Sequence, residues 1–148
     1  MKAVIQRVSR AKVSIEGAVR GEVGRGLLVL LGVAAGDGSG DAAFIAGKVG
    51  RLRIFPDDRG LMNRSVADIG GAILAVSQFT LLGDARKGNR PSFGRAAEPA
   101  LAERLYREVV DGLRSTGIEV QTGEFSAMME VELVNDGPVT IILESPAS

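Results

Sequence analysis

The chain has 148 residues, of which 45% are hydrophobic and 24% charged, and 18 basic and 18 acidic residues balance to a formal net charge of zero. This size and composition predict one globular domain, residues 1–148, and exclude disordered and fibrous classes. The sequence contains no His, Cys or Trp. It therefore excludes disulfides and both the Ser-His-Asp and the Cys-His kinds of catalytic site.

The same absences leave zinc without its usual ligands. The one pair of adjacent carboxylates, Asp57-Asp58, falls in a turn, so we expect no metal and no cofactor. No apolar run approaches the ~20 residues of a membrane span. Met1 leads straight into a strand pattern instead of a signal peptide. We therefore expect a cytoplasmic protein without a membrane partner. Any catalysis must use hydroxyls, amides, backbone groups or the substrate's own atoms.

The first quarter of the chain is patterned as strands. Residues 2–8 predict one strand, and the alternation around Val13 and Ile15 predicts a second that turns at Glu16-Gly17. Residues 19–23 continue this hairpin. Residues 26–33 are continuously apolar, which favours a strand buried on both faces.

A glycine-rich loop at residues 36–40 precedes a predicted helix over residues 42–53. Asp41 is its expected cap, and its apolar face holds Phe44, Ile45, Val49 and Leu52. Residues 55–60 predict a turn. Residues 71–79 predict a strand whose apolar body ends in polar residues.

A second helix is predicted over residues 99–115, with Pro in its first turn and Gly117 after its end. Short strands follow at residues 118–121, 129–133 and 139–143, the last two joined by a turn at Asn135–Pro138. Taken together, the elements predict a mixed α/β (α+β) domain. We expect a strongly curved, partly closed sheet or barrel with two helices packed outside.

Three stretches offer chemistry. Ser77, Gln78, Phe79 and Thr80 present hydroxyls, an amide, a ring and backbone N–H groups at a strand end, although composition alone favours a plain strand terminus. Residues 84–95 hold four cations, including Arg86, Lys87 and Arg90, as in a phosphate-contacting loop or a solvated basic loop. By its residues alone, Asn135–Thr140 is a turn.

The motifs SQFTL at residues 77–81 and NDGPVT at residues 135–140, with their separation, resemble the D-aminoacyl-tRNA deacylase family. The likeness extends through MKAVIQRVSRAKV, KGNRPSF and LYREVVDGLRSTGIEV and covers nearly the whole chain. A related family that edits L-alanine carries Met at the position of Phe79, so Phe79 favours the D-specific branch.

The resemblance implies a homodimer that hydrolyses D-aminoacyl-tRNA, and also glycyl-tRNA, to free tRNA and the amino acid. Each pocket would be lined by Ser77–Thr80 of one subunit and entered by a cis Gly137-Pro138 pair of the other, which rejects L-amino acids. It further implies that Arg7 braces the Gly-Pro carbonyls, that Phe125 lies near the pocket, and that the tRNA's terminal ribose assists catalysis.

The expected partner is the 3′-terminal aminoacyl-adenosine of tRNA, with no DNA and no membrane, and Arg86, Lys87 and Arg90 would contact its phosphates. Two alternatives stay open. One is the related deacylase that removes L-alanine from mischarged tRNA. The other is a tRNA-binding module without catalysis.

Overall fold

The fold was obtained as a computed structural model, which describes residues 1–146. Its elements in chain order are β1 (Lys2–Ile15), β2 (Ala18–Val23), β3 (Gly26–Gly32), α1 (Ser39–Arg51), β4 (Phe55–Pro56), β5 (Met62–Arg64), β6 (Ala72–Ser77), the 3-10 helix η1 (Phe79–Leu82), α2 (Pro99–Ser115), β7 (Glu119–Thr122) and β8 (Glu130–Glu144). No helix within residues 1–146 is long and apolar enough to cross a membrane.

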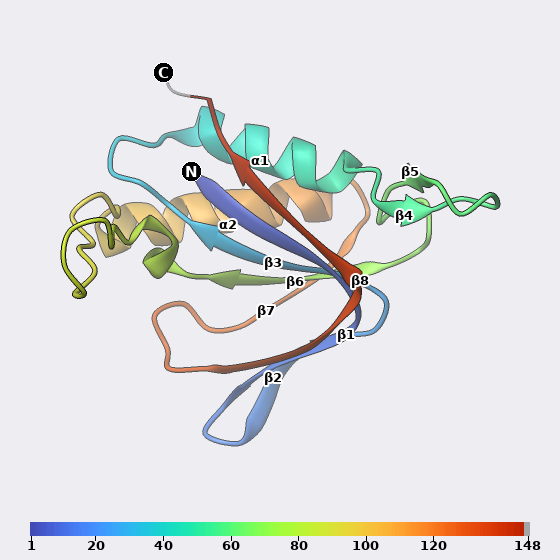
Figure 1. Cartoon of the computed structure of the whole chain (residues 1–148), viewed down its shortest axis with the longest axis horizontal. Coiled ribbons are helices and arrows are strands. Elements are labelled where there is room, and N and C mark those ends of the chain that lie inside the picture. The colour runs from blue at the N-terminus through green and yellow to red at the C-terminus, as the bar shows by residue number, and fades with distance from the viewer. Residues whose placement is uncertain (147–148) are drawn as a thin grey trace.

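Strand β1 organises the sheet because it pairs with three other strands. Its first half pairs with β3, its second half with β2, and its whole length with β8. The strand order is β2-β1-β3-β6-β7, with β8 on β1. β1 and β8 bend together through the molecule (Figure 1). The outermost strands β2 and β7 also contact each other, so the sheet nearly closes.

Both helices pack against each other and cover the same side of the sheet (Figure 1). The predicted stripe of α2 is buried at Leu105, Val109 and Leu113. Burying one such side chain stabilises the fold by about 1.5–3 kcal/mol. Strand β3 is buried on both faces, as expected: Leu27 faces the helices and Leu28 faces a smaller cluster inside the curve of the sheet.

The mixed α/β fold with a curved, partly closed sheet and two outer helices is therefore confirmed. The bounds of α2 also agree with the prediction. Several local predictions were wrong. The two strands expected within residues 2–15 are one bent strand. Helix α1 begins at Ser39 with Gly38 as its cap, and Asp41 sits inside the first turn. The strand expected to reach Phe79 ends at Ser77, and η1 follows.

The segment Asn135–Pro138 is a bulge within β8 and not a chain reversal. Gln6 pairs with Thr140 and Val8 with Asn135, so β8 advances five residues while β1 advances two. The additional residues leave the ladder, and the strand then continues in its original direction along β1. The Gly137-Pro138 peptide bond in this bulge is cis, and Gly137 has a φ of 137°.

Candidate active site

The carboxyl end of β6 opens into a cavity of about 640 Å³. β6 runs parallel to β3, and where its ladder ends the N–H of Gln78 donates to the Leu31 carbonyl at 2.7 Å. The chain then turns into η1, which places Ser77, Gln78, Phe79 and Thr80 at the cavity wall. The remaining wall residues come from β6, from the residue after β3, from the start of α2 and the segment before it, and from β8 and the segment leading into it: Val33, Val76, Ala97, Pro99, Ala102, Phe125, Ser126, Ala127, Met128, Met129 and Val131.

The polar groups of this cavity are hydroxyls, amides and backbone groups. Ser77 and Gln78 are half-buried, while Phe79 and Thr80 are exposed. The Gln78 amide donates to the Thr80 hydroxyl at 3.1 Å. Phe79 and Thr80 begin η1, and the first N–H groups of a helix have no acceptor inside it. No side chain caps η1, so these two N–H groups are available to a ligand.

Among the described residues, no charged side chain lines this cavity. The wall therefore supplies neither a conventional general base nor a carboxylate for metal binding. No group of three or more acidic residues within residues 1–146 is placed to hold a metal ion. The chemistry that this wall offers is orientation by shape, together with hydrogen bonding to a developing negative charge.

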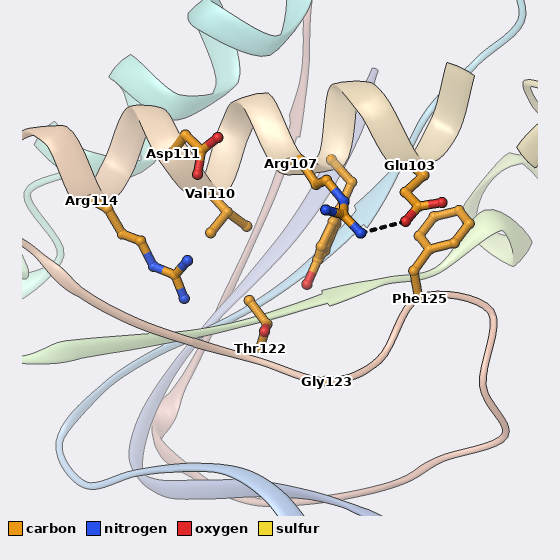
Figure 2. Close-up of a pocket in the computed structure, with 9 residues that line it drawn as sticks. Glu103, Arg107, Val110, Asp111, Arg114, Thr122, Gly123 and Phe125 are labelled. Carbon is orange, nitrogen blue, oxygen red and sulfur yellow. Dashed lines mark hydrogen bonds and ion pairs between the residues drawn. The ribbon is translucent and has the colours of Figure 1, made fainter. Parts of the chain in front are cut away.

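Phe125 lines both this cavity and a second, polar pocket of about 330 Å³ under α2, which Figure 2 shows. Its ring meets the ring of Tyr106 edge-on at 6.3 Å. The Tyr106 hydroxyl donates to the Ala75 carbonyl at 2.8 Å, and burial raises the pKa of Tyr106 to about 12. Tyr106 is thus a packing residue that keeps its proton at neutral pH. On the rim, Arg107 is paired with Glu103 (Figure 2).

Gly137 and Pro138 are exposed and do not line the cavity of their own chain. Arg7 reaches the bulge from β1, donating from Nε to the Asp136 carbonyl at 3.0 Å and from a terminal nitrogen to the Ile54 carbonyl at 2.7 Å. Its partner is thus the carbonyl before the Gly-Pro pair. Within one chain, Ser77–Thr80 and Phe125 line the same cavity, and Arg7 contacts the bulge of β8. The bulge does not line that cavity.

The basic segment follows η1 directly. Backbone N–H groups of Asp84 and Ser92 donate to each other's carbonyls at 2.7 and 2.8 Å, which closes the loop at its base. Lys87 and Arg90 are exposed at its tip, and Arg86 is paired with Asp84 through two of its nitrogens. These hydrogen bonds hold the pKa of Asp84 well below its usual range.

Several wall residues escaped the sequence-based prediction. Val33, Ala97, Pro99 and Ala102 are apolar or small, and nothing in the chemistry of such residues distinguishes a cavity wall from a core. Phe93, in the basic segment, also reaches the site, because its ring meets the ring of Phe79, a contact that nothing in the sequence predicts.

Comparison with known proteins gives a consistent result. The model of the family described as D-Tyr-tRNA(Tyr) deacylase matches residues 4–144. A relative from Anaeromyxobacter dehalogenans, named D-aminoacyl-tRNA deacylase, is 63% identical over 145 residues, covering 98% of this chain and 97% of its own. A protein of the same name from Symbiobacterium thermophilum is 57% identical, with coverage of 98% and 96%.

Two solved structures share the fold. One, named c-Myc DNA Unwinding Element Binding Protein, superposes with a TM-score of 0.93 at 43% identity, covering 99% of this chain and 100% of that one. The other, a probable eukaryotic D-amino acid tRNA deacylase, has a TM-score of 0.80 at 16% identity, with coverage of 97% and 98%.

Proposed function

The chain belongs to the D-Tyr-tRNA(Tyr) deacylase family, and on that premise we propose that it hydrolyses D-aminoacyl-tRNA to free tRNA and the D-amino acid. The observation that carries this proposal is the cavity at the end of β6, which offers backbone N–H groups and hydroxyls but no charged side chain. An aminoacyl ester is already activated, so its hydrolysis does not demand a strong protein nucleophile. Orientation and oxyanion stabilisation suffice.

In this proposal the N–H groups of Phe79 and Thr80 donate to the ester carbonyl oxygen as it gains negative charge. Water adds to the carbonyl carbon, and the ribose oxygen leaves with a proton. The neighbouring hydroxyl of the tRNA's terminal ribose helps to activate that water. Ser77 and Gln78 shape the site for the adenosine and the ester. Thr80 is not the nucleophile, because no base lies beside its hydroxyl.

We assign the discrimination between D and L substrates to the bulge of β8 from a second copy of the chain. Gly137 lacks a side chain and Pro138 lacks an N–H, so the exposed segment presents mainly carbonyl oxygens. One of them would accept a hydrogen bond from the substrate's α-amino group, while the backbone leaves no room for an L side chain. A site that excludes L side chains by shape accepts many D side chains. It also accepts glycine, which makes glycyl-tRNA a substrate in this proposal.

Arg7 is assigned to steadying that bulge, since it joins the carbonyl of Asp136 to the carbonyl of Ile54. The working enzyme in this proposal is a homodimer acting on tRNA in the cytoplasm. The phosphates of the tRNA would be contacted by Arg86, Lys87 and Arg90.

The test is hydrolysis of D-tyrosyl-tRNA and L-tyrosyl-tRNA side by side, before and after exhaustive chelation. We expect turnover of the D substrate alone, unaffected by chelator, because the chain contains no His or Cys. Loss of activity in chelator that zinc restores would contradict the metal-free mechanism. Turnover of L-alanyl-tRNA instead would favour the related editing enzyme, and salt-sensitive tRNA binding without turnover would favour a binding module.

A further inference from the structure

Phe93, in the basic segment, touches the candidate active site from outside the cavity. Its ring meets the ring of Phe79 edge-on, with 5.2 Å between centroids and 70° between planes. It also covers the end of η1, because a side chain added at Gly83 would lie 3.0 Å from the Phe93 ring. We propose that Phe93 is a positioning residue that holds η1, and through it the N–H groups of Phe79 and Thr80, in the geometry for ester hydrolysis.

The two rings are not core residues. Phe79 is 56% exposed and Phe93 is 38% exposed, so neither ring is held in place by burial in the core. An edge-to-face contact between aromatic rings is attractive beyond the apolar area that it buries. Holding such rings together on the surface costs side-chain entropy, which makes the contact a restraint on η1 more than a source of overall stability.

The loop that carries Phe93 is itself restrained. The backbone pair between Asp84 and Ser92 closes it immediately after η1, and Phe93 is the next residue. The basic loop and η1 lie side by side at one end of the molecule (Figure 1). The loop proposed to contact phosphates is thus joined to the pair of N–H groups proposed to stabilise the oxyanion.

This arrangement separates two roles, and it rests on the proposed function. Lys87 and Arg90 point to solvent and would govern substrate binding. Phe93 contacts η1 and would govern the rate of the chemical step. An interaction that acts only on transition-state geometry lowers kcat when it is removed and leaves KM nearly constant.

The experiment compares Phe93→Ala, Phe93→Leu and Phe93→Tyr with the full-length wild type on D-tyrosyl-tRNA. We expect kcat to fall about 2- to 12-fold in Phe93→Ala, the range to which the loss of one aromatic pair converts. KM and its salt dependence should stay close to wild type. Phe93→Tyr keeps the ring edge and should restore kcat, whereas Phe93→Leu, which fills the space without a ring, should not.

Val19→Ala, a change at an exposed apolar residue of β2, serves as the matched control. Unchanged kcat in Phe93→Ala, a change confined to KM, or full activity in Phe93→Leu would each overturn the inference. If Phe93→Ala does not fold, the comparison of Leu with Tyr decides it. A wild type that turns over no D-tyrosyl-tRNA would instead refute the proposed function itself.

Discussion

The hydroxyl of Thr80 stands at the cavity rim, where a nucleophile would be expected, but its surroundings do not activate it. The Gln78 amide donates a hydrogen bond to it at 3.1 Å. An amide cannot accept the hydroxyl proton as a base, and no charged side chain among the described residues lines the same wall.

Thr80→Ala should therefore remain an active enzyme with a modestly reduced rate. The loss of one partly solvated hydrogen bond contributes about 0.5–1.5 kcal/mol, which corresponds to a rate reduction of at most about tenfold. Removing a true nucleophile reduces kcat by a factor on the order of 10⁶. The measurement is single-turnover hydrolysis, with Thr80→Val as the isosteric control. An acyl group trapped on residue 80 of the wild type would contradict this expectation.

At the level of elements, helix α1 begins with a polar contact that sequence analysis assigned to the wrong position. The carboxylate of Asp41 accepts a hydrogen bond from the N–H of Gly38 at 2.9 Å, from within the first turn. This contact and the positive end of the helix favour the charged carboxylate. The hydrogen bond from Gly38 is the largest cause of the lowered pKa of Asp41.

Asp41→Asn should lower the free energy of unfolding by about 0.5–1 kcal/mol at neutral pH. Because the folded state lowers the pKa of Asp41, its contribution is present above the unfolded value near 3.8 and is lost as pH falls through the folded value. Urea unfolding at neutral pH and near pH 2 checks this, with the exposed Asp111→Asn as control. A difference between wild type and variant that does not shrink in acid would count against it.

The basic loop is the second element whose role is open to test. Replacing Arg86, Lys87 and Arg90 together by Ala should raise KM. The slope of log KM against log salt concentration should become shallower by about 0.7–0.9 for each phosphate contact that is lost. Single changes should differ: Arg90→Ala should have the larger effect, since two nitrogens of Arg86 already bind Asp84. Hydrolysis of D-tyrosyl-tRNA over a series of salt concentrations measures KM and its salt dependence for each variant. A salt dependence identical to wild type would make the loop a solvated surface.

Local signals predicted some elements well. The bounds of α2 follow from Pro99 in its first turn and Gly117 after its end, where Gly117 adopts a φ of 88°. The bulge of β8 was instead predicted as a turn between two strands, because Asn-Asp-Gly favours turns in any short peptide. Pairing with β1 decides otherwise, and β1 lies more than a hundred residues away in sequence. Long-range pairing of this kind leaves no local signal.

The candidate site was predictable to the extent that its residues have distinctive chemistry. Ser77–Thr80 and Phe125 do meet in one cavity, and Arg7 does reach the bulge of β8. The contact of Phe93 with Phe79 was not predictable, because it depends on the closure of a loop by Asp84 and Ser92 and on the direction in which η1 turns. Sequence shows that a ring is available, but not which neighbour it meets.

For the whole molecule, the arrangement within one chain leaves the proposed site incomplete. The cavity lies beyond the end of β6, and none of its wall residues comes from the bulge of β8. Gly137 and Pro138 instead face solvent on their own chain. If the bulge selects chirality, it must do so in the cavity of a second copy, and a two-fold symmetric dimer would then contain two equivalent shared sites.

Complementation between two defective variants tests this sharing. Ala127→Trp fills the cavity, and Gly137→Ala places a methyl group 2.7 Å from the Val139 side chain and 3.2 Å from Arg7, displacing the bulge. Each variant alone should be nearly inactive on D-tyrosyl-tRNA. After equal amounts are unfolded and refolded together, half of the dimers should be mixed and carry one competent site of two, giving about a quarter of wild-type activity.

The recovered activity should keep the refusal of L-tyrosyl-tRNA, because the competent site combines an intact cavity with an intact bulge. Native mass spectrometry establishes that mixed dimers have formed, and refolded wild type gives the reference activity. Adding Arg7→Ala to the Ala127→Trp chain should weaken the recovery or its selectivity, since that chain supplies the bulge. Mixed dimers without recovered activity would mean that the bulge does not complete the neighbouring cavity, and chirality would then have to arise within a single chain.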